Sequence, residues 1–202
     1  MKAKHIGTAV LALGMALAGC GGKTSFTVAG GFYDANGNLV PLKNPGLVLA
    51  NGDEEISVPV GATRFSFSKQ VEYGDNYNVV IKTQPQFMTC SPYSSTGTAG
   101  RLESINVPLS CAQNTHAVLV TITGLTAGAT GDNKLQLING STVNEVAGTA
   151  TSSSFGGIAV GLSYGVAVFQ QPTGQTCTVA NGSGIMGDAD RADVTVTCVK
   201  NT

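Results

Sequence analysis

The sequence contains no tryptophan, only two histidines and few charged residues. Lys, Arg, Asp and Glu make up 11% of the 202 residues, and the formal net charge is -1 at pH 7. A nearly neutral chain has no strong field to attract nucleic acid, so we expect no nucleic-acid partner. Most acid–base and nucleophilic mechanisms use histidine, and His5 lies in a segment that we expect to be removed. We therefore expect no catalysis and no cofactor.

The N-terminus has the pattern of a secretory signal. Lys2 and Lys4 precede an uncharged, mostly apolar run from Ile6 to Ala18. The run has 13 residues, which is too short to span a bilayer because a spanning helix needs about 20. We expect residues 1–19 to form a helical signal peptide that is cleaved from the mature chain.

The signal ends in Leu17-Ala18-Gly19-Cys20, which resembles the lipobox of bacterial lipoproteins. The resemblance implies cleavage before Cys20 and covalent attachment of fatty acyl chains to that cysteine. In this family a residue other than Asp after the cysteine, here Gly21, is associated with the outer membrane. We expect a membrane partner through the lipid on Cys20, with residues 20–25 as a short tether. The alternative is a cleavable signal with an incidental free cysteine.

The remainder of the chain contains one pattern twice. YNVVIKTQPQFMTC at 77–90 matches YGVAVFQQPTGQTC at 164–177, with equivalent residues 87 positions apart. Cys111 and Cys198 keep the same spacing, and residues 46–52 match 134–140 with a spacing of 88. We expect two domains, repeat 1 at 26–112 and repeat 2 at 113–202. Near the start of each copy we align 27–31 with 121–124.

Short alternating runs, Asn-Gly turns and abundant Gly, Ser, Thr and Val favour strands over helices. The fold class that we predict is all-β, with two tandem immunoglobulin-like β-sandwich domains of about seven strands each. Tyr77 and Tyr164 lie in segments that resemble the tyrosine corner of immunoglobulin-like domains, where a hydroxyl caps a turn. Residues 32–41 and 46–49 resemble the opening hairpin of transthyretin-like and collagen-adhesin B-type modules.

Four cysteines follow Cys20, and they allow three pairings. The repeat favours Cys90 with Cys111 and Cys177 with Cys198, because other pairings would treat equivalent positions differently. Export to an oxidising compartment permits both bonds. Each bond would close a long Gly- and Ser-rich loop, at 91–104 and 178–191.

Few other residues suggest a site. The remaining histidine, His116, stands at the domain junction, where a surface or linker role is expected. Asp188, Asp190 and Asp193 lie in one segment and form a weak candidate for a calcium site, although a solvated loop is the simpler interpretation. Tyr93, expected at the tip of the first disulfide loop, is the candidate residue for contact with a ligand.

These observations predict a lipid-anchored cell-envelope module with a structural or adhesive role and no catalysis. The alternative is a periplasmic accessory protein that binds cell-wall glycan or another protein.

Overall fold

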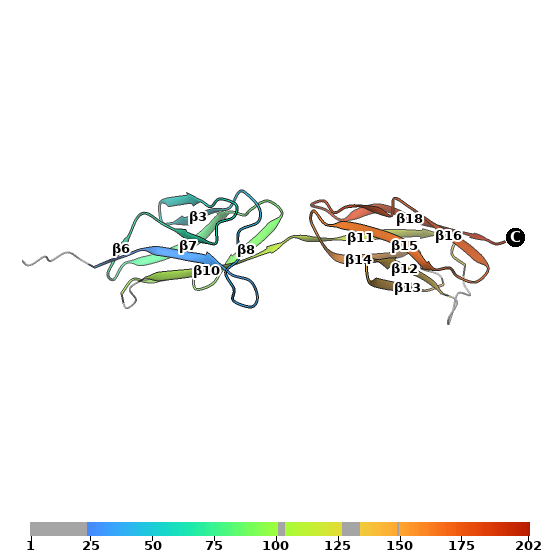
Figure 1. The fold of residues 1–202 in the computed structure, drawn as a ribbon, viewed down its shortest axis with the longest axis horizontal. Helices are drawn as coiled ribbons and strands as arrows, with labels where there is room; N and C mark the ends of the chain where they lie inside the picture. Colours follow the sequence, from blue (N-terminus) through green and yellow to red (C-terminus); the bar gives the residue numbers. More distant parts are fainter. Residues whose placement is uncertain (1–23, 101–103, 127–133, 149) are drawn as a thin grey trace, which may run out of the picture.

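The computed structural model describes residues 24–100, 104–126, 134–148 and 150–202. Within these ranges all regular elements are β-strands, and they form two sandwiches that lie end to end (Figure 1). The predicted all-β class is confirmed. The predicted signal peptide and Cys20 lie outside the described residues. In the described part of the chain there is no helix with the length and apolar character needed to cross a membrane.

Repeat 1 contains the first ten strands. These are β1 (Ser25–Phe26), β2 (Val28–Phe32), β3 (Val48–Asn51), β4 (Glu54–Ser57), β5 (Arg64–Ser66), β6 (Val71–Glu72), β7 (Asn76–Thr83), β8 (Met88–Pro92), β9 (Thr96–Thr98) and β10 (Ile105–Gln113). One sheet has the order β5-β2-β10-β8 and the other β4-β3-β7-β9, while β1 pairs with β6 alone. In the sheet β5-β2-β10-β8, the first and last strands along the chain, β2 and β10, are parallel neighbours.

Repeat 2 follows the same plan. Its strands are β11 (Thr115–Thr123), β12 (Leu135–Asn139), β13 (Thr142–Val146), β14 (Ser152–Ala159), β15 (Ser163–Gln170), β16 (Gln175–Ala180), β17 (Ser183–Ile185) and β18 (Arg191–Lys200). The sheet orders are β14-β11-β18-β16 and β13-β12-β15-β17, and β11 and β18 are parallel. Each repeat has two four-stranded sheets, whereas about seven strands per domain were predicted.

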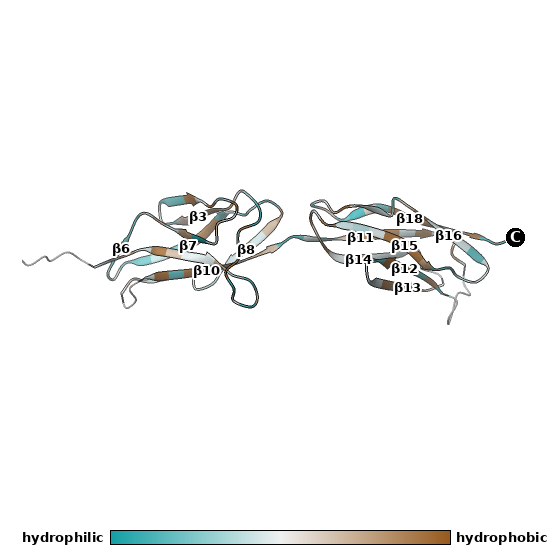
Figure 2. Cartoon of the chain, viewed as in Figure 1, coloured by the Kyte–Doolittle hydropathy of each residue, from teal (hydrophilic) through white to brown (hydrophobic). Residues whose placement is uncertain are grey.

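The buried side chains form two separate clusters, one within residues 26–109 and one within 118–198. The period of two explains how the strands supply them. Val79 is 1% exposed, whereas the next residue, Val80, is 43% exposed and points to the other face of its sheet. Hydrophobic and hydrophilic segments accordingly alternate along the strands of both sandwiches (Figure 2).

The predicted alignment of the first strands is wrong. Gly30 lies opposite Val107 on β10, and Val120 lies opposite Val194 on β18, so Gly30 corresponds to Val120. The match is not visible in the sequence because equivalent positions on the paired strands have residues of different size in the two repeats. Gly30 faces Phe65, whereas Val120 faces the smaller Ser153. A Cβ on Gly30 would lie only 2.5 Å from the Phe65 ring, so glycine is required there.

The segments between the paired cysteines are not simple loops, which corrects the prediction for 91–104 and 178–191. Each segment crosses to the opposite sheet and adds a short strand, β9 beside β7 and β17 beside β15. On these strands Gly97 lies opposite Tyr77, and Gly184 lies opposite Tyr164. The ring and hydroxyl of each tyrosine lie against the glycine. The Gly-containing Thr-Gly-Thr and Ser-Gly-Ile sequences gave little indication of strands.

Candidate functional site: the joint between the repeats

A single residue connects the two sandwiches. Strand β10 ends at Gln113 and β11 begins at Thr115, so Asn114 is the whole connection. The Asn114 amide N–H donates to the carbonyl oxygen of Phe87 at 2.8 Å, and its own carbonyl accepts from the N–H of Val160 at 3.0 Å. Asn114 is therefore bonded to repeat 1 on one side and to repeat 2 on the other.

Side chains reinforce the joint. The Thr89 hydroxyl donates to Oδ1 of Asn114 at 2.9 Å. The Gln113 amide donates from Nε2 to the carbonyl of Val160 at 3.4 Å and accepts from Nδ2 of Asn44 at 3.3 Å. A chain of amide groups thus runs from a loop of repeat 1 to a turn of repeat 2. The connection is hydrogen-bonded at both ends and contains no spacer segment.

The acidic loop before β18 packs against the start of β11. Asp190 Oδ1 accepts from the backbone N–H of Ala117 at 2.8 Å. His116 Nε2 lies 3.3 Å from Asp188 Oδ1, and His116 Nδ1 lies 3.6 Å from Asp190 Oδ1. The candidate linker histidine and two of the candidate calcium ligands are therefore neighbours, and they hold the first strand of repeat 2 just beyond the joint.

The third candidate calcium ligand, Asp193, lies on β18 and has another partner. Asp193 accepts from the guanidinium of Arg191 at 2.7 Å. Within the described ranges, no three His, Cys, Asp or Glu side chains are placed to hold a metal ion. Among the described residues the ring of His116 contacts carboxylates and no hydroxyl or thiol, so the structure does not assemble a hydrolytic triad around it.

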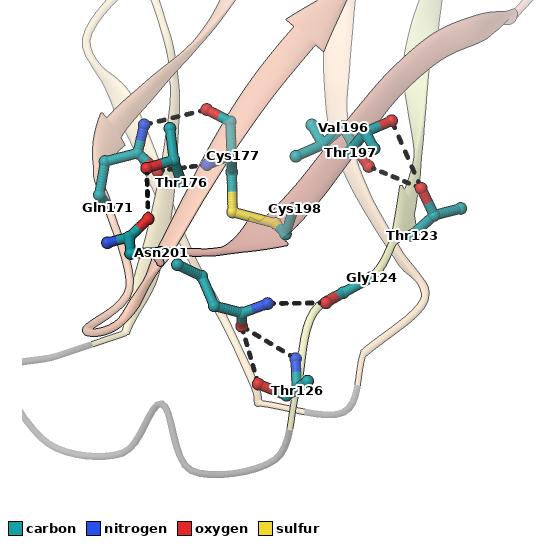
Figure 3. Close-up of a disulfide and its surroundings, with 11 residues drawn as sticks. Thr123, Gly124, Thr126, Gln171, Thr176, Cys177, Val196, Thr197, Cys198 and Asn201 are labelled. Atoms are coloured by element: carbon teal, nitrogen blue, oxygen red, sulfur yellow. Dashed lines mark hydrogen bonds between the residues drawn. A yellow bond between two sulfur atoms is a disulfide. The ribbon is translucent and has the colours of Figure 1, made fainter.

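At the far end of repeat 2, Asn201 makes the same contacts to its own repeat that Asn114 makes to repeat 1. The Asn201 N–H donates to the carbonyl of Gly174 at 3.0 Å, and the Thr176 hydroxyl donates to Asn201 Oδ1 at 2.7 Å (Figure 3). Asn201 thus matches Asn114, Gly174 matches Phe87, and Thr176 matches Thr89. Each repeat closes its last strand with the same asparagine arrangement.

The disulfides brace the strands that lead to these asparagines. The structure pairs Cys90 with Cys111 and Cys177 with Cys198, the pairing that the repeat predicts. In each repeat the two cysteines face each other directly across an antiparallel pair, β8–β10 and β16–β18. The bond therefore joins neighbouring strands of one sheet rather than the two sheets of the sandwich.

A glutamine supports each disulfide. Gln171 accepts from the Cys177 N–H at 2.7 Å and donates to the Cys177 carbonyl at 2.9 Å (Figure 3). Gln84 makes the same two bonds to Cys90, at 2.8 and 3.0 Å. These contacts satisfy the outer backbone groups of β8 and β16, which are edge strands. The repeated Gln-Pro element of the sequence therefore has a structural role beside the cysteines.

Tyr93 is not at a loop tip. It directly follows β8, and its N–H donates to the carbonyl of Pro108 at 2.8 Å. Its side chain is 59% exposed and stands apart from the joint. The sequence placed Tyr93 in a long loop because the short strand β9 was not recognised.

Known proteins resemble this chain in fold and not in sequence. No protein-family model matches the chain, and no curated protein matches it. The solved structure of the Bacillus anthracis TIE protein is similar over 87% of this chain, with 12% identity and a TM-score of 0.56. The match covers 34% of that protein, so this chain spans about a third of its length. The likeness is one of fold.

Two other solved structures align over most of this chain with lower TM-scores. The Streptococcal ancillary pilin aligns over 88% of this chain and 62% of its own, with 12% identity and a TM-score of 0.31. A single B repeat unit of the collagen binding surface protein of Staphylococcus aureus aligns over 89% of this chain and 100% of its own, with 11% identity and a TM-score of 0.33.

Proposed function

We propose that this protein is a lipid-anchored, non-catalytic spacer of the bacterial cell envelope, which holds the far end of repeat 2 away from the membrane. The observation that carries the proposal is the parallel pairing of β2 with β10 and of β11 with β18, which are the first and last strands of one sheet in each repeat. A chain that enters and leaves a sandwich on parallel neighbours enters at one end and leaves at the other. Two such sandwiches joined by one residue extend in a line (Figure 1).

The dimensions support this role. The last strands, β10 and β18, contain 9 and 10 residues. At about 3.3 Å per residue, the two repeats together span on the order of 60 Å. Only three residues separate Cys20 from Thr24, where the described chain begins. Four residue steps reach at most about 14 Å, so a lipid on Cys20 would keep repeat 1 close to the membrane while repeat 2 stands farther out.

The first part of the test concerns the lipid. The full chain is expressed in a Gram-negative host that is fed a fatty acid with an alkyne tag. We expect the tag on the wild-type protein and its loss in a Cys20→Ala variant, which should move from the membrane fraction to the soluble one. A wild-type protein without the tag would contradict the anchor.

The second part concerns the spacing. A fluorophore is placed through a non-natural amino acid either at Asp75 or at Thr202. Asp75 lies in the turn after β6, where the Tyr73 N–H donates to the carbonyl of Thr24, and Thr202 lies at the far end of repeat 2. Energy transfer to a dye in the membrane of reconstituted vesicles should be strong at the first position and weak at the second. Equal transfer from both positions would mean that the protein lies flat, and it would overturn the spacer role even if Cys20 is lipidated.

A further inference from the structure

The end of repeat 1 that faces the tether contains a hollow of about 530 Å³. Tyr73 and Tyr77 line it, together with the polar side chains of Ser94, Thr98 and Asn106. Its volume is within the range of about 300–1,000 Å³ that is usual for small-molecule sites. Both tyrosines line it because β6, β7 and β9 come together at this end of the repeat.

Two glycines seat the aromatic rings. A Cβ on Gly97 would lie 2.6 Å from the hydroxyl of Tyr77, so only glycine allows that ring to lie across β9. The ring of Tyr73 lies in ordinary contact distance of Gly100, at 3.5 Å from where a Cβ would be. The side chain of Tyr73 nevertheless remains accessible, since the residue is 64% exposed. One ring is thus held in the wall of the hollow, and the other is available at its mouth.

The polar groups of the lining favour a ligand that is rich in hydroxyl groups. The described residues that line the hollow carry no charge, and they offer two hydroxyls and an amide beside the tyrosines. The Thr98 hydroxyl already donates to Asn76 at 2.8 Å, which leaves its oxygen free to accept. A tyrosine ring provides a flat apolar face with a polar tip, and a sugar ring has complementary apolar faces rimmed by hydroxyls.

A neighbouring hollow allows a ligand longer than one ring. It has a volume of about 390 Å³, shares Tyr77 with the first and adds the amides of Asn51, Asn76 and Asn78. The charged residues Asp53, Lys69 and Asp75 also line it, and Asp53 and Lys69 form an ion pair at 2.6 Å. We propose that repeat 1 binds a saccharide here, with a sugar ring stacked on Tyr73 and its hydroxyls bonded to Ser94, Thr98 and Asn106. The site depends on none of the lipid chemistry at Cys20.

Repeat 2 has the same framework with different side chains at the positions that line the hollow. The bond from Gly74 N–H to the Ala99 carbonyl, 2.7 Å long, corresponds to that from Gly161 N–H to the Met186 carbonyl, 2.8 Å long. This register aligns Tyr73 with Val160 and Ala99 with Met186. Met186 is 1% exposed, so a much longer side chain is buried where repeat 1 has alanine. Tyr164, the counterpart of Tyr77, is 4% exposed.

The two differences supply the test variants. Tyr73→Val and Ala99→Met each copy the residue of repeat 2, so each is compatible with this fold. The first removes the stacking platform. The second places a longer side chain at Ala99, a lining position that is 1% exposed, and changes neither tyrosine. Tyr93→Val is the matched control, because Tyr93 is similarly exposed at 59% and does not line the hollow. Thermal melts of all variants show whether the sandwich is intact.

Binding to neutral oligosaccharides is measured on the full chain by saturation-transfer NMR and titration calorimetry. The probes are tetramers of β-1,4-linked N-acetylglucosamine, β-1,4-linked glucose and α-1,4-linked glucose. We expect saturable binding of at least one tetramer, a loss of affinity of at least tenfold in Tyr73→Val and Ala99→Met, and no change in Tyr93→Val. Absence of saturable binding to all three, or unchanged binding by folded Tyr73→Val, would overturn the proposal.

Discussion

Phe87 in repeat 1 and Gly174 in repeat 2 occupy the same turn position, and both have left-handed backbone angles, with φ of 57° and 73°. Both carbonyls accept the N–H of the asparagine that closes their repeat, Asn114 or Asn201. The shared bond explains why the backbone must take this conformation in both copies. Glycine adopts it freely, whereas a bulky side chain adopts it at a cost of about 1–2 kcal/mol.

A glycine at this turn position should therefore be tolerated in repeat 1, whereas a residue with a side chain should destabilise repeat 2. Phe87→Gly should leave the free energy of unfolding of repeat 1 unchanged or raise it by about 1 kcal/mol. Gly174→Ala should lower that of repeat 2 by about 1 kcal/mol. No atom lies within 4 Å of a Cβ added at Gly174, so the backbone angle alone is tested there. Calorimetric melts of the full chain measure both, and full stability in Gly174→Ala would contradict the argument.

Loss of a disulfide should weaken only the repeat that contains it. Each bond joins cysteines 21 positions apart, and closing a loop of this size stabilises a fold by about 3 kcal/mol. We expect Cys90→Ser and Cys177→Ser together to melt well below the wild type under oxidising conditions. Hydrogen exchange with each single variant should show faster opening of repeat 1 or repeat 2, respectively. An unchanged melting temperature in the double variant would disprove the stabilising role.

The joint should loosen when Asn114 is replaced. Asn114→Ala removes the acceptor of the Thr89 hydroxyl and leaves the connection to its backbone bonds and to the side chain of Gln113. Because these side-chain contacts fix the orientation of repeat 2, we expect a broader distribution of end-to-end distances in solution scattering and spin-label measurements. Asn201→Ala removes the same contact at the far end, and it should leave that distribution unchanged.

Acid should weaken repeat 1 through Glu54. Hydrogen bonds from the Ser68 hydroxyl and the Ser68 N–H, with a further one from the Lys69 N–H, hold the pKa of this carboxyl below its usual value. A group whose pKa is lowered by folding adds stability above its unfolded-state pKa, and this stability is lost as the pH falls through the folded-state pKa. We expect Glu54→Gln to make the unfolding free energy of repeat 1 less dependent on pH in the acid range.

The control for this titration is in repeat 2, where hydrogen bonding to Lys134 lowers the pKa of Glu145. Glu145→Gln should alter the acid dependence of repeat 2 and leave that of repeat 1 intact. Hydrogen exchange across a pH series separates the two. A wild-type-like acid profile of repeat 1 in Glu54→Gln would show that the Ser68 contacts do not contribute in solution.

The sequence predicted the parts of the fold that both repeats express with the same residues. The shared Tyr, Gln-Pro and Cys positions revealed the repeat, and the repeat identified the disulfide pairing. It failed where the repeats reach the same packing with different residues. Gly30 is paired with Phe65, whereas the equivalent Val120 is paired with Ser153, and this equivalence cannot be recognised without the strand pairing.

The sequence did not show which candidate residues lie close together, for a related reason. Tyr73 and Tyr77 are close in sequence, but the strand that completes their hollow, β9, could be recognised only from its pairing with β7. Asp188 and His116 are 72 positions apart and meet because the last strand returns beside the first. Contacts of this kind depend on topology, which local composition does not specify.

The parallel pairs β2–β10 and β11–β18 also determine how the protein responds to being pulled. Tension between its two ends runs along the strands of each pair, so the ladder of hydrogen bonds is sheared as a unit instead of opening one bond at a time. Once a pair gives way, the disulfide keeps the segment between its cysteines out of the extension. Each repeat should therefore resist extension, and after it unfolds it should lengthen only by the part of its chain that lies outside the disulfide loop.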